Sequence, residues 1–200
     1  MLRRLACVLI PLGLASCASP PAHFYAGAVL PQGSRVAVLP LANYTQNREA
    51  PDRLLPAISV ELHGVKGLAV VDAGEVEAAL SVDPWLALDR IPPDVIDRFG
   101  EELRADLIVV GSVLAYGYRP GEVPPVPEVS LSLKFLETPG GRCVWSGTHS
   151  REGTDREHVF GIGRIQSVEQ LAEETIAELL ATVPVGPPLV IMPTPSEETP

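Results

Sequence analysis

Side chains that can act as nucleophile, base or metal ligand are few in this chain and are poorly spaced for chemistry. Ser146, His149 and Asp155 have the types of a hydrolase triad, but no Gly-x-Ser-x-Gly turn surrounds Ser146. The four histidines lack the spacing with cysteines or carboxylates that zinc sites use: His23, His63, His149 and His158. We therefore expect no enzyme activity, no metal and no cofactor.

One glycine-containing segment resembles a nucleotide loop only at its start. The sequence "GIGRIQ", beginning at Gly161, lacks the third glycine of a dinucleotide-binding loop and does not follow a first strand. We interpret it as a turn that leads from a strand into a helix.

Two other segments are candidates for contact with a ligand or a partner. Asn43 and Thr45 follow a predicted buried strand, at the end where open α/β sheets often bind ligands. A turn held by the Asn43 side chain is the alternative. Pro124 and Pro125 lie in "RPGEVPPVPE", which is either a polyproline II segment for a partner or a stiff loop with nothing bound.

The start of the chain has the layout of a secretory signal. Arg3 and Arg4 precede an apolar stretch of about ten residues, which is shorter than the ~20 that span a membrane. Residues 14–17, "LASC", resemble the bacterial lipobox, in which the cysteine is acylated and becomes the new N-terminus. We expect residues 1–16 to be the signal and Cys17 to carry lipid; the alternative is an ordinary signal cut elsewhere. In lipoproteins of this type, a residue other than Asp at position 18 implies the outer membrane.

The charge balance restricts the partners of the mature chain. The full chain has a net charge of −10, and loss of Arg3 and Arg4 with the signal would leave 13 basic and 25 acidic residues. Nucleic acid binding depends on Lys and Arg that neutralise phosphates, so we expect no nucleic acid partner. The same balance argues against electrostatic binding to anionic lipids. The lipid on Cys17 would hold the protein to the membrane.

Composition divides the chain into four parts. Residues 1–16 are the signal, and residues 17–34, rich in Pro, Ala, Gly and Ser, are predicted to be a flexible tether. Residues 35–183 have the length of one domain. Residues 184–200 contain many prolines and end in acidic residues, which predicts a disordered tail.

The middle of the chain alternates strand and helix patterns. Strands are predicted at residues 35–41, 67–71, 105–119, 128–137 and 142–150, with a hairpin turn at "TPGG". Helices are predicted to begin near Asp52, Asp72, Pro92 and Ser167. In the strand at 142–150, Cys143 and Trp145 are two residues apart, so we expect both on the buried face. These patterns predict an α/β (α+β) domain with helices packed on a mixed parallel and antiparallel sheet.

Four segments in order resemble a family of periplasmic lipoprotein domains. "VAVLPLANYT", "LAVVDAGEVEAAL", "ELRADLIVVGSV" and "VSLSLKFLETPGGRCVWS" are similar to motifs of the group formed by the curli-secretion protein CsgG, the penicillin-binding-protein activator LpoB and the N-terminal domain of TolB. Leu41 stands where that group usually has an aromatic residue, and Arg104 stands where it usually has glycine. The resemblance implies the fold, an envelope location and a protein-binding role, and it implies no catalytic residues.

Three functions remain open from the sequence. The first is a lipid-anchored outer-membrane lipoprotein that faces the periplasm and binds another, unidentified envelope protein without catalysis. The second is a subunit of a CsgG-like secretion or transport assembly, for which oligomerisation would be needed. The third is a small-ligand-binding domain.

Overall fold

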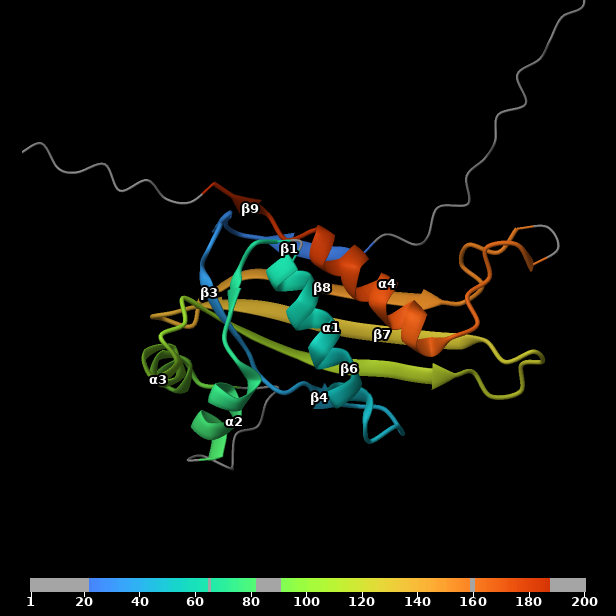
Figure 1. Cartoon of the computed structure of the whole chain (residues 1–200), viewed down its shortest axis with the longest axis horizontal. Coiled ribbons are helices and arrows are strands. Elements are labelled where there is room, and N and C mark those ends of the chain that lie inside the picture. The colour runs from blue at the N-terminus through green and yellow to red at the C-terminus, as the bar shows by residue number, and fades with distance from the viewer. Residues whose placement is uncertain (1–21, 65, 82–90, 159–160, 188–200) are drawn as a thin grey trace, which may run out of the picture.

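A mixed β-sheet forms the centre of the protein (Figure 1). The computed structural model describes residues 22–64, 66–81, 91–158 and 161–187. The strands of the main sheet are β1 (His23–Ala26), β3 (Arg35–Val38), β4 (Ala42–Asn43), β5 (Ala69–Val70), β6 (Leu107–Tyr118), β7 (Pro127–Glu137) and β8 (Cys143–Glu152). Their order is β1-β8-β7-β6-β3-β5, and β4 pairs with β6.

Strand direction follows the connections between the strands. β3 pairs in parallel with β5 and with β6, and helices lie in the connections, as in other parallel sheets. β6, β7 and β8 are joined by short loops and pair antiparallel. The predicted mixed sheet is therefore confirmed.

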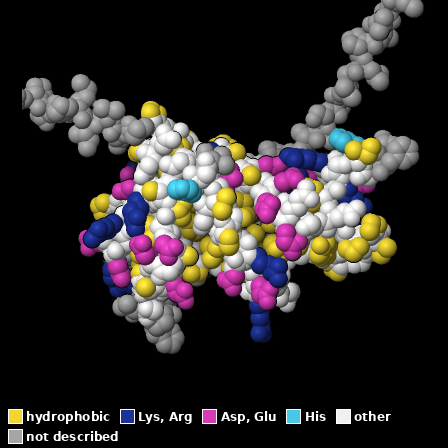
Figure 2. All heavy atoms as spheres, in the orientation of Figure 1, with side chains coloured by type: hydrophobic (Ala, Val, Ile, Leu, Met, Phe, Trp, Pro, Cys, Tyr) yellow, Lys and Arg dark blue, Asp and Glu magenta, His cyan; other side chains and the backbone are white. Residues whose placement is uncertain are grey.

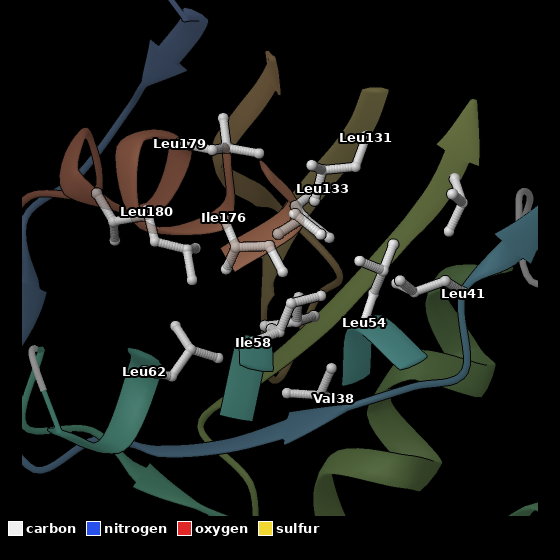
Figure 3. Close-up of a cluster of buried hydrophobic side chains, with 14 of the residues drawn as sticks. Val38, Leu41, Leu54, Ile58, Leu62, Leu131, Leu133, Ile176, Leu179 and Leu180 are labelled. Atoms are coloured by element: carbon white, nitrogen blue, oxygen red, sulfur yellow. The ribbon is translucent and has the colours of Figure 1, made fainter. Parts of the chain in front are cut away.

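The described residues form four helices, which cover the two faces of the sheet unequally. They are α1 (Ala50–Gly64), α2 (Ala73–Ser81), α3 (Pro93–Leu103) and α4 (Val168–Ala181). α1 and α4 lie side by side over one face, and their buried side chains join those of the strands in one cluster (Figure 3). α2 and α3 pack on the other face, against β3 and the first half of β6.

β7 shows why the main core lies under α1 and α4. Val129, Leu131, Leu133 and Phe135 are fully buried on the helix side, and Lys134 between them is exposed. This is the predicted alternation of a strand with one buried face. The Phe135 ring meets the Trp145 ring edge-on, with 5.2 Å between the ring centres.

α4 buries one face against the sheet. Val168, Leu171, Thr175 and Leu179 of the helix are buried, and so is Val183 just after it. The Ser167 hydroxyl accepts a hydrogen bond from the Gln170 backbone N–H, which caps the helix start. The Gln170 side chain donates to Glu174 and not to the Ser167 backbone, so only one of the two hydrogen bonds of a Ser–Gln capping box forms.

The domain is longer than residues 35–183, which corrects two expectations. The expected tether contains β1, which pairs with β8, and β2 (Leu30–Pro31). The expected tail contains β9 (Val185–Gly186), which pairs in parallel with β2. Strand pairing supplies hydrogen-bond partners at both ends, so segments without their own hydrophobic periodicity become ordered.

Two local predictions also differ from the structure. Cys143 is only half-buried, because Phe135 pairs with Trp145 and Leu136 with Cys143, so Val144 is an extra residue in β8. This β-bulge changes the alternation, and Val144 takes the buried place expected for Cys143. Helix α1 begins at Ala50, so Asp52 lies in its first turn and is not its cap.

Among the helices that the structure describes, none has the length and apolar character needed to cross a membrane.

Candidate interaction surfaces

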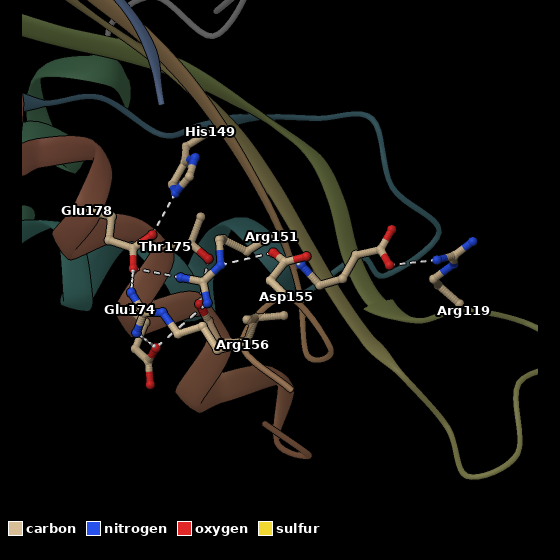
Figure 4. Close-up of polar contacts among 10 residues, drawn as sticks. Arg119, His149, Arg151, Asp155, Arg156, Glu174, Thr175 and Glu178 are labelled. Atoms are coloured by element: carbon tan, nitrogen blue, oxygen red, sulfur yellow. Dashed lines mark hydrogen bonds and ion pairs between the residues drawn. The ribbon is translucent and has the colours of Figure 1, made fainter. Parts of the chain in front are cut away.

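A buried charged cluster joins β8, the loop after it and α4 (Figure 4). The Arg151 side chain is fully buried and donates to Asp155 Oδ2 at 3.1 Å and to Glu178 Oε1 at 2.7 Å. Glu178 also contacts His149 Nε2 at 2.8 Å, and Arg156 Nη2 donates to Glu178. The Glu178 carboxylate of α4 therefore contacts side chains from β8 and from the loop after it.

The surroundings of Glu178 favour its ionised form. Burial opposes ionisation of Glu178, but the hydrogen bonds from His149 and Arg151 and the charges of Arg151 and Arg156 outweigh it and hold the pKa of Glu178 below its usual value. A carboxylate occupied by several donors is a poor general base. We therefore assign the cluster a structural role.

The three residues that have the types of a hydrolase triad, Ser146, His149 and Asp155, do not come together. His149 faces α4 and binds Glu178, whereas Ser146, three positions away on β8, lies on the opposite face of the strand. Asp155 binds Arg151. In the part of the chain that the structure describes, no group of three or more His, Cys, Asp or Glu residues is arranged to hold a metal ion.

Asn43 and Thr45 form the turn that was one of the two alternatives. Asn43 Oδ1 accepts from the Thr45 backbone N–H at 2.9 Å and from its hydroxyl at 2.8 Å, and Asn43 Nδ2 donates to the Asn47 carbonyl. This side-chain turn uses the polar groups that a ligand would need. Tyr44 between them is 61% exposed.

Pro124 and Pro125 lie on the exposed β6–β7 loop. The Pro124 carbonyl accepts from Arg164 Nη2 at 3.1 Å, and the Tyr118 hydroxyl donates to the Gln166 carbonyl at 3.3 Å. The β6–β7 loop is thereby joined to the β8–α4 loop. The structure does not bring this region to Asn43, which pairs with Val113 in the middle of β6.

These two loops and the last residue of β6 carry exposed apolar side chains at one end of the sheet, toward the right in Figure 2. Val123 is 93% exposed, Ile162 is 67% exposed and Tyr118 is 49% exposed. We call these three residues the apolar loop tips. Sequence reasoning missed Val123 and Ile162, because an apolar residue in a Pro/Gly-rich loop has no periodic partner that would indicate its role.

A groove of about 670 Å³ runs between α1 and α4. Pro56, Ala57, Val60 and Ala177 provide apolar lining, and Val60 is 71% exposed. Glu61 and Glu173 are among the acidic residues that line the groove. It is a shallow surface between two helices that also contribute to the main core.

Cys17, the predicted lipidation site, lies outside the described residues. The structure therefore gives only the position of the first strand that follows it. β1 begins at His23, at the sheet edge beside β8.

This arrangement defines an α/β domain whose conspicuous surface features are exposed apolar loops and a helix groove. No family model and no curated protein sequence matches the chain. Solved structures do. The PelC dodecamer of Paraburkholderia phytofirmans is 22% identical with a TM-score of 0.61, and the match covers 82% of this chain and 98% of that one.

Lipoprotein GNA1162 of Neisseria meningitidis is 18% identical with a TM-score of 0.55, over 72% of this chain and 95% of that one. The LpoB C-terminal domain of Salmonella enterica is 17% identical with a TM-score of 0.42, over 61% of this chain and 84% of that one. The PelC and GNA1162 matches establish that this chain shares their fold.

Proposed function

We propose that this protein is a lipid-anchored lipoprotein of the outer membrane that faces the periplasm and binds another envelope protein without catalysis. The observation that carries the proposal is the sequence "LASC", which ends at Cys17 only six residues before β1. A domain attached so closely to an acylated residue stays beside the membrane.

Three further observations support an interaction role. One of the solved structures with this fold is named a lipoprotein. The nucleophile and base candidates of the sequence are either on opposite faces of β8 or engaged in ion pairs. Exposed apolar residues on loops and in the helix groove are typical of contact surfaces.

The anchor is tested by replacing Cys17. We expect Cys17→Ser to abolish lipid attachment, measured by mass spectrometry of the N-terminal peptide, and to remove the protein from the membrane fraction. Cys143→Ser is the matched control, because it also removes one thiol and leaves the lipobox intact. A Cys17→Ser protein that stays in the membrane with unchanged mobility contradicts the proposal.

The outer-membrane assignment has its own test. Ala18 follows the predicted modified cysteine, and Ala18→Asp introduces the residue associated with retention in the inner membrane. We expect the wild-type protein in the denser outer-membrane fraction of a sucrose gradient and the variant in the inner-membrane fraction. Equal distribution of both proteins would refute the assignment. Cross-linking in intact envelopes followed by mass spectrometry then identifies the partner.

A second candidate is a subunit of an oligomeric secretion or transport assembly. The observation that favours it is the match to PelC, whose structure is described as a dodecamer. Mass photometry of the purified lipoprotein in detergent tests this candidate, since a defined multiple of the monomer mass supports it and a monomer at all concentrations opposes it.

A further inference from the structure

We infer that the apolar loop tips, Tyr118, Val123 and Ile162, contact the lipid surface to which Cys17 is anchored. This inference rests on the proposed lipid anchor and adds an orientation to it: the end of the sheet that carries the β6–β7 and β8–α4 loops faces the membrane.

The register of the strands places the anchor at the same end as the tips. His23 pairs with Thr148, Thr148 with Ser132, and Ser132 with Ser112, so His23 is level with Ser112. β8 runs toward the loop end and β1 is antiparallel to it, so the chain enters β1 from the loop end (Figure 1).

The length of chain before β1 limits how far the domain can lie from the bilayer. His23 lies six positions after Cys17, and an extended chain covers at most 3.3–3.6 Å per position, or about 20 Å in total. Tyr118 lies six residues beyond Ser112 along β6, which is also about 20 Å at the rise of a β-strand. If residues 17–22 extend fully in the direction of the loop end, Cys17 therefore reaches the level of Tyr118 and no farther.

The opposite end of the domain is thereby kept from the membrane. β1 runs away from the loop end toward Val29, β2 and β9. If that end faced the bilayer, residues 17–22 would have to reverse direction before running back along the sheet. Leu107, at the far end of β6, lies five residues or about 17 Å from the level of Ser112, and the reversal uses part of the ~20 Å available, so Cys17 would not reach that end.

The side chains at the loop end suit a lipid surface. Val123 and Ile162 are among the most exposed large apolar side chains of the described residues, at 93% and 67%. Their loops are tied together by the Arg164–Pro124 and Tyr118–Gln166 hydrogen bonds, so both loops are held at this end. Tyr118 has the ring and hydroxyl that favour the boundary between headgroups and acyl chains.

The charges near the tips indicate an apolar contact and not an electrostatic one. Arg119 pairs with Glu152 at 2.6 Å, and Arg164 pairs with Glu157 at 3.5 Å. Glu122 is exposed on the same loop. With its cations paired, this end has little attraction for anionic lipid, so contact should not depend on the fraction of anionic lipid.

Depth-dependent fluorescence quenching in vesicles tests the inference on the full lipoprotein. A polarity-sensitive fluorophore is attached to Val123→Cys, to Ile162→Cys or, as matched control, to Val29→Cys, each in a Cys143→Ser background. Val29 is an exposed valine, 65% accessible, at the far end of the domain. The vesicles contain phosphatidylethanolamine with or without phosphatidylglycerol, and brominated acyl chains serve as quenchers.

We expect fluorescence loss and a blue shift at positions 123 and 162, none at position 29, and the same result in both lipid mixtures. Flotation of the vesicles reports the anchor separately. Protein that floats while position 123 responds no more than position 29 overturns the orientation but leaves the anchor intact. Protein that fails to float overturns the anchor and this inference together. A photo-cross-linker at position 123 that captures protein instead of lipid in cells also overturns it.

Discussion

At the residue scale, the fully buried Arg151 places a positive charge inside the protein, which is costly unless the charge is paired. A guanidinium cannot lose its proton in a protein, so burial requires carboxylate partners. Asp155 and Glu178 provide them, and Glu174 Oε2 lies 4.0 Å away. Arg151 Nη2 itself makes no hydrogen bond among the described residues, so the loss of one partner carboxylate leaves a charge with little alternative compensation.

We predict that Glu178→Gln destabilises the protein by about 2 kcal/mol at pH 7, because a buried cation loses its closest carboxylate. Glu178 has a folded-state pKa below its unfolded value, so its contribution is present above the unfolded pKa of about 4.3 and is lost as pH falls through the folded pKa. Denaturant unfolding at several pH values should show the difference between wild type and variant shrinking in acid.

Glu173→Gln on the same helix is the control for this prediction. Glu173 is exposed, so its replacement should change the free energy of unfolding by less than about 0.5 kcal/mol. A Glu178→Gln variant as stable as Glu173→Gln at pH 7 would show that the cluster contributes nothing to stability.

The buried residues of the sheet could be predicted only in part from the sequence. The apolar alternation of β7 predicted the buried set correctly, because a strand's faces are fixed by its period of two. His149 and Arg151 lie on the buried face of the neighbouring strand β8, yet they are polar, and both bind Glu178 of α4. No local pattern connects residues 151 and 178, so this cluster could not be found without the fold.

At the element scale, the end of α3 explains a departure noted in the sequence. Arg104 stands where similar domains usually have glycine, and it adopts φ +49° and ψ +41°, the left-handed conformation at the helix C-terminus. A side chain with a Cβ is strained there by about 1 kcal/mol, whereas glycine is not. The motif position is therefore a backbone requirement that this chain meets with an unfavourable residue.

We predict that Arg104→Gly raises the free energy of unfolding by about 0.5–1 kcal/mol, because it relieves the left-handed strain. The Arg104 side chain is exposed, so its loss should cost little. Arg104→Ala is the control, since it removes the side chain but keeps the Cβ. Chemical denaturation should place Ala near wild type and Gly above it; an equal gain for both variants would exclude the backbone explanation.

Whether an element could be predicted from the sequence depended on whether its stabilising contacts are local or come from distant segments. α3 and α4 carry apolar faces and start signals in their own sequence, and both appear where predicted. β1, β2 and β9 are only two to four residues long, and their hydrogen bonds come from segments far away in the chain. The composition of residues 17–34 and 184–200 indicated flexibility, because composition does not show whether a segment pairs with a distant strand.

At the scale of the whole molecule, both ends of the described chain are joined to the domain. β1 closes one edge of the main sheet on β8, and β2 pairs with β9 beside it (Figure 1). The Lys66 ammonium group donates to the Ala181 and Val183 carbonyls, which holds the chain after α4 in place. The domain therefore extends beyond residue 183 and includes β9.

We predict that a chain ending at Val183 is less stable than one ending at Pro187. The shorter chain loses the bonds from Leu30 N–H to the Pro184 carbonyl at 2.8 Å and from Gln32 N–H to the Gly186 carbonyl at 2.9 Å. Two net hydrogen bonds, with added exposure of the buried Leu30, amount to about 2 kcal/mol. The chain ending at Pro187 keeps β9 and should unfold like the full-length protein. Thermal and denaturant unfolding of the full-length protein and the two shortened chains measures their relative stability. Equal stability of the Val183 and Pro187 chains would show that residues 184–187 do not stabilise the domain.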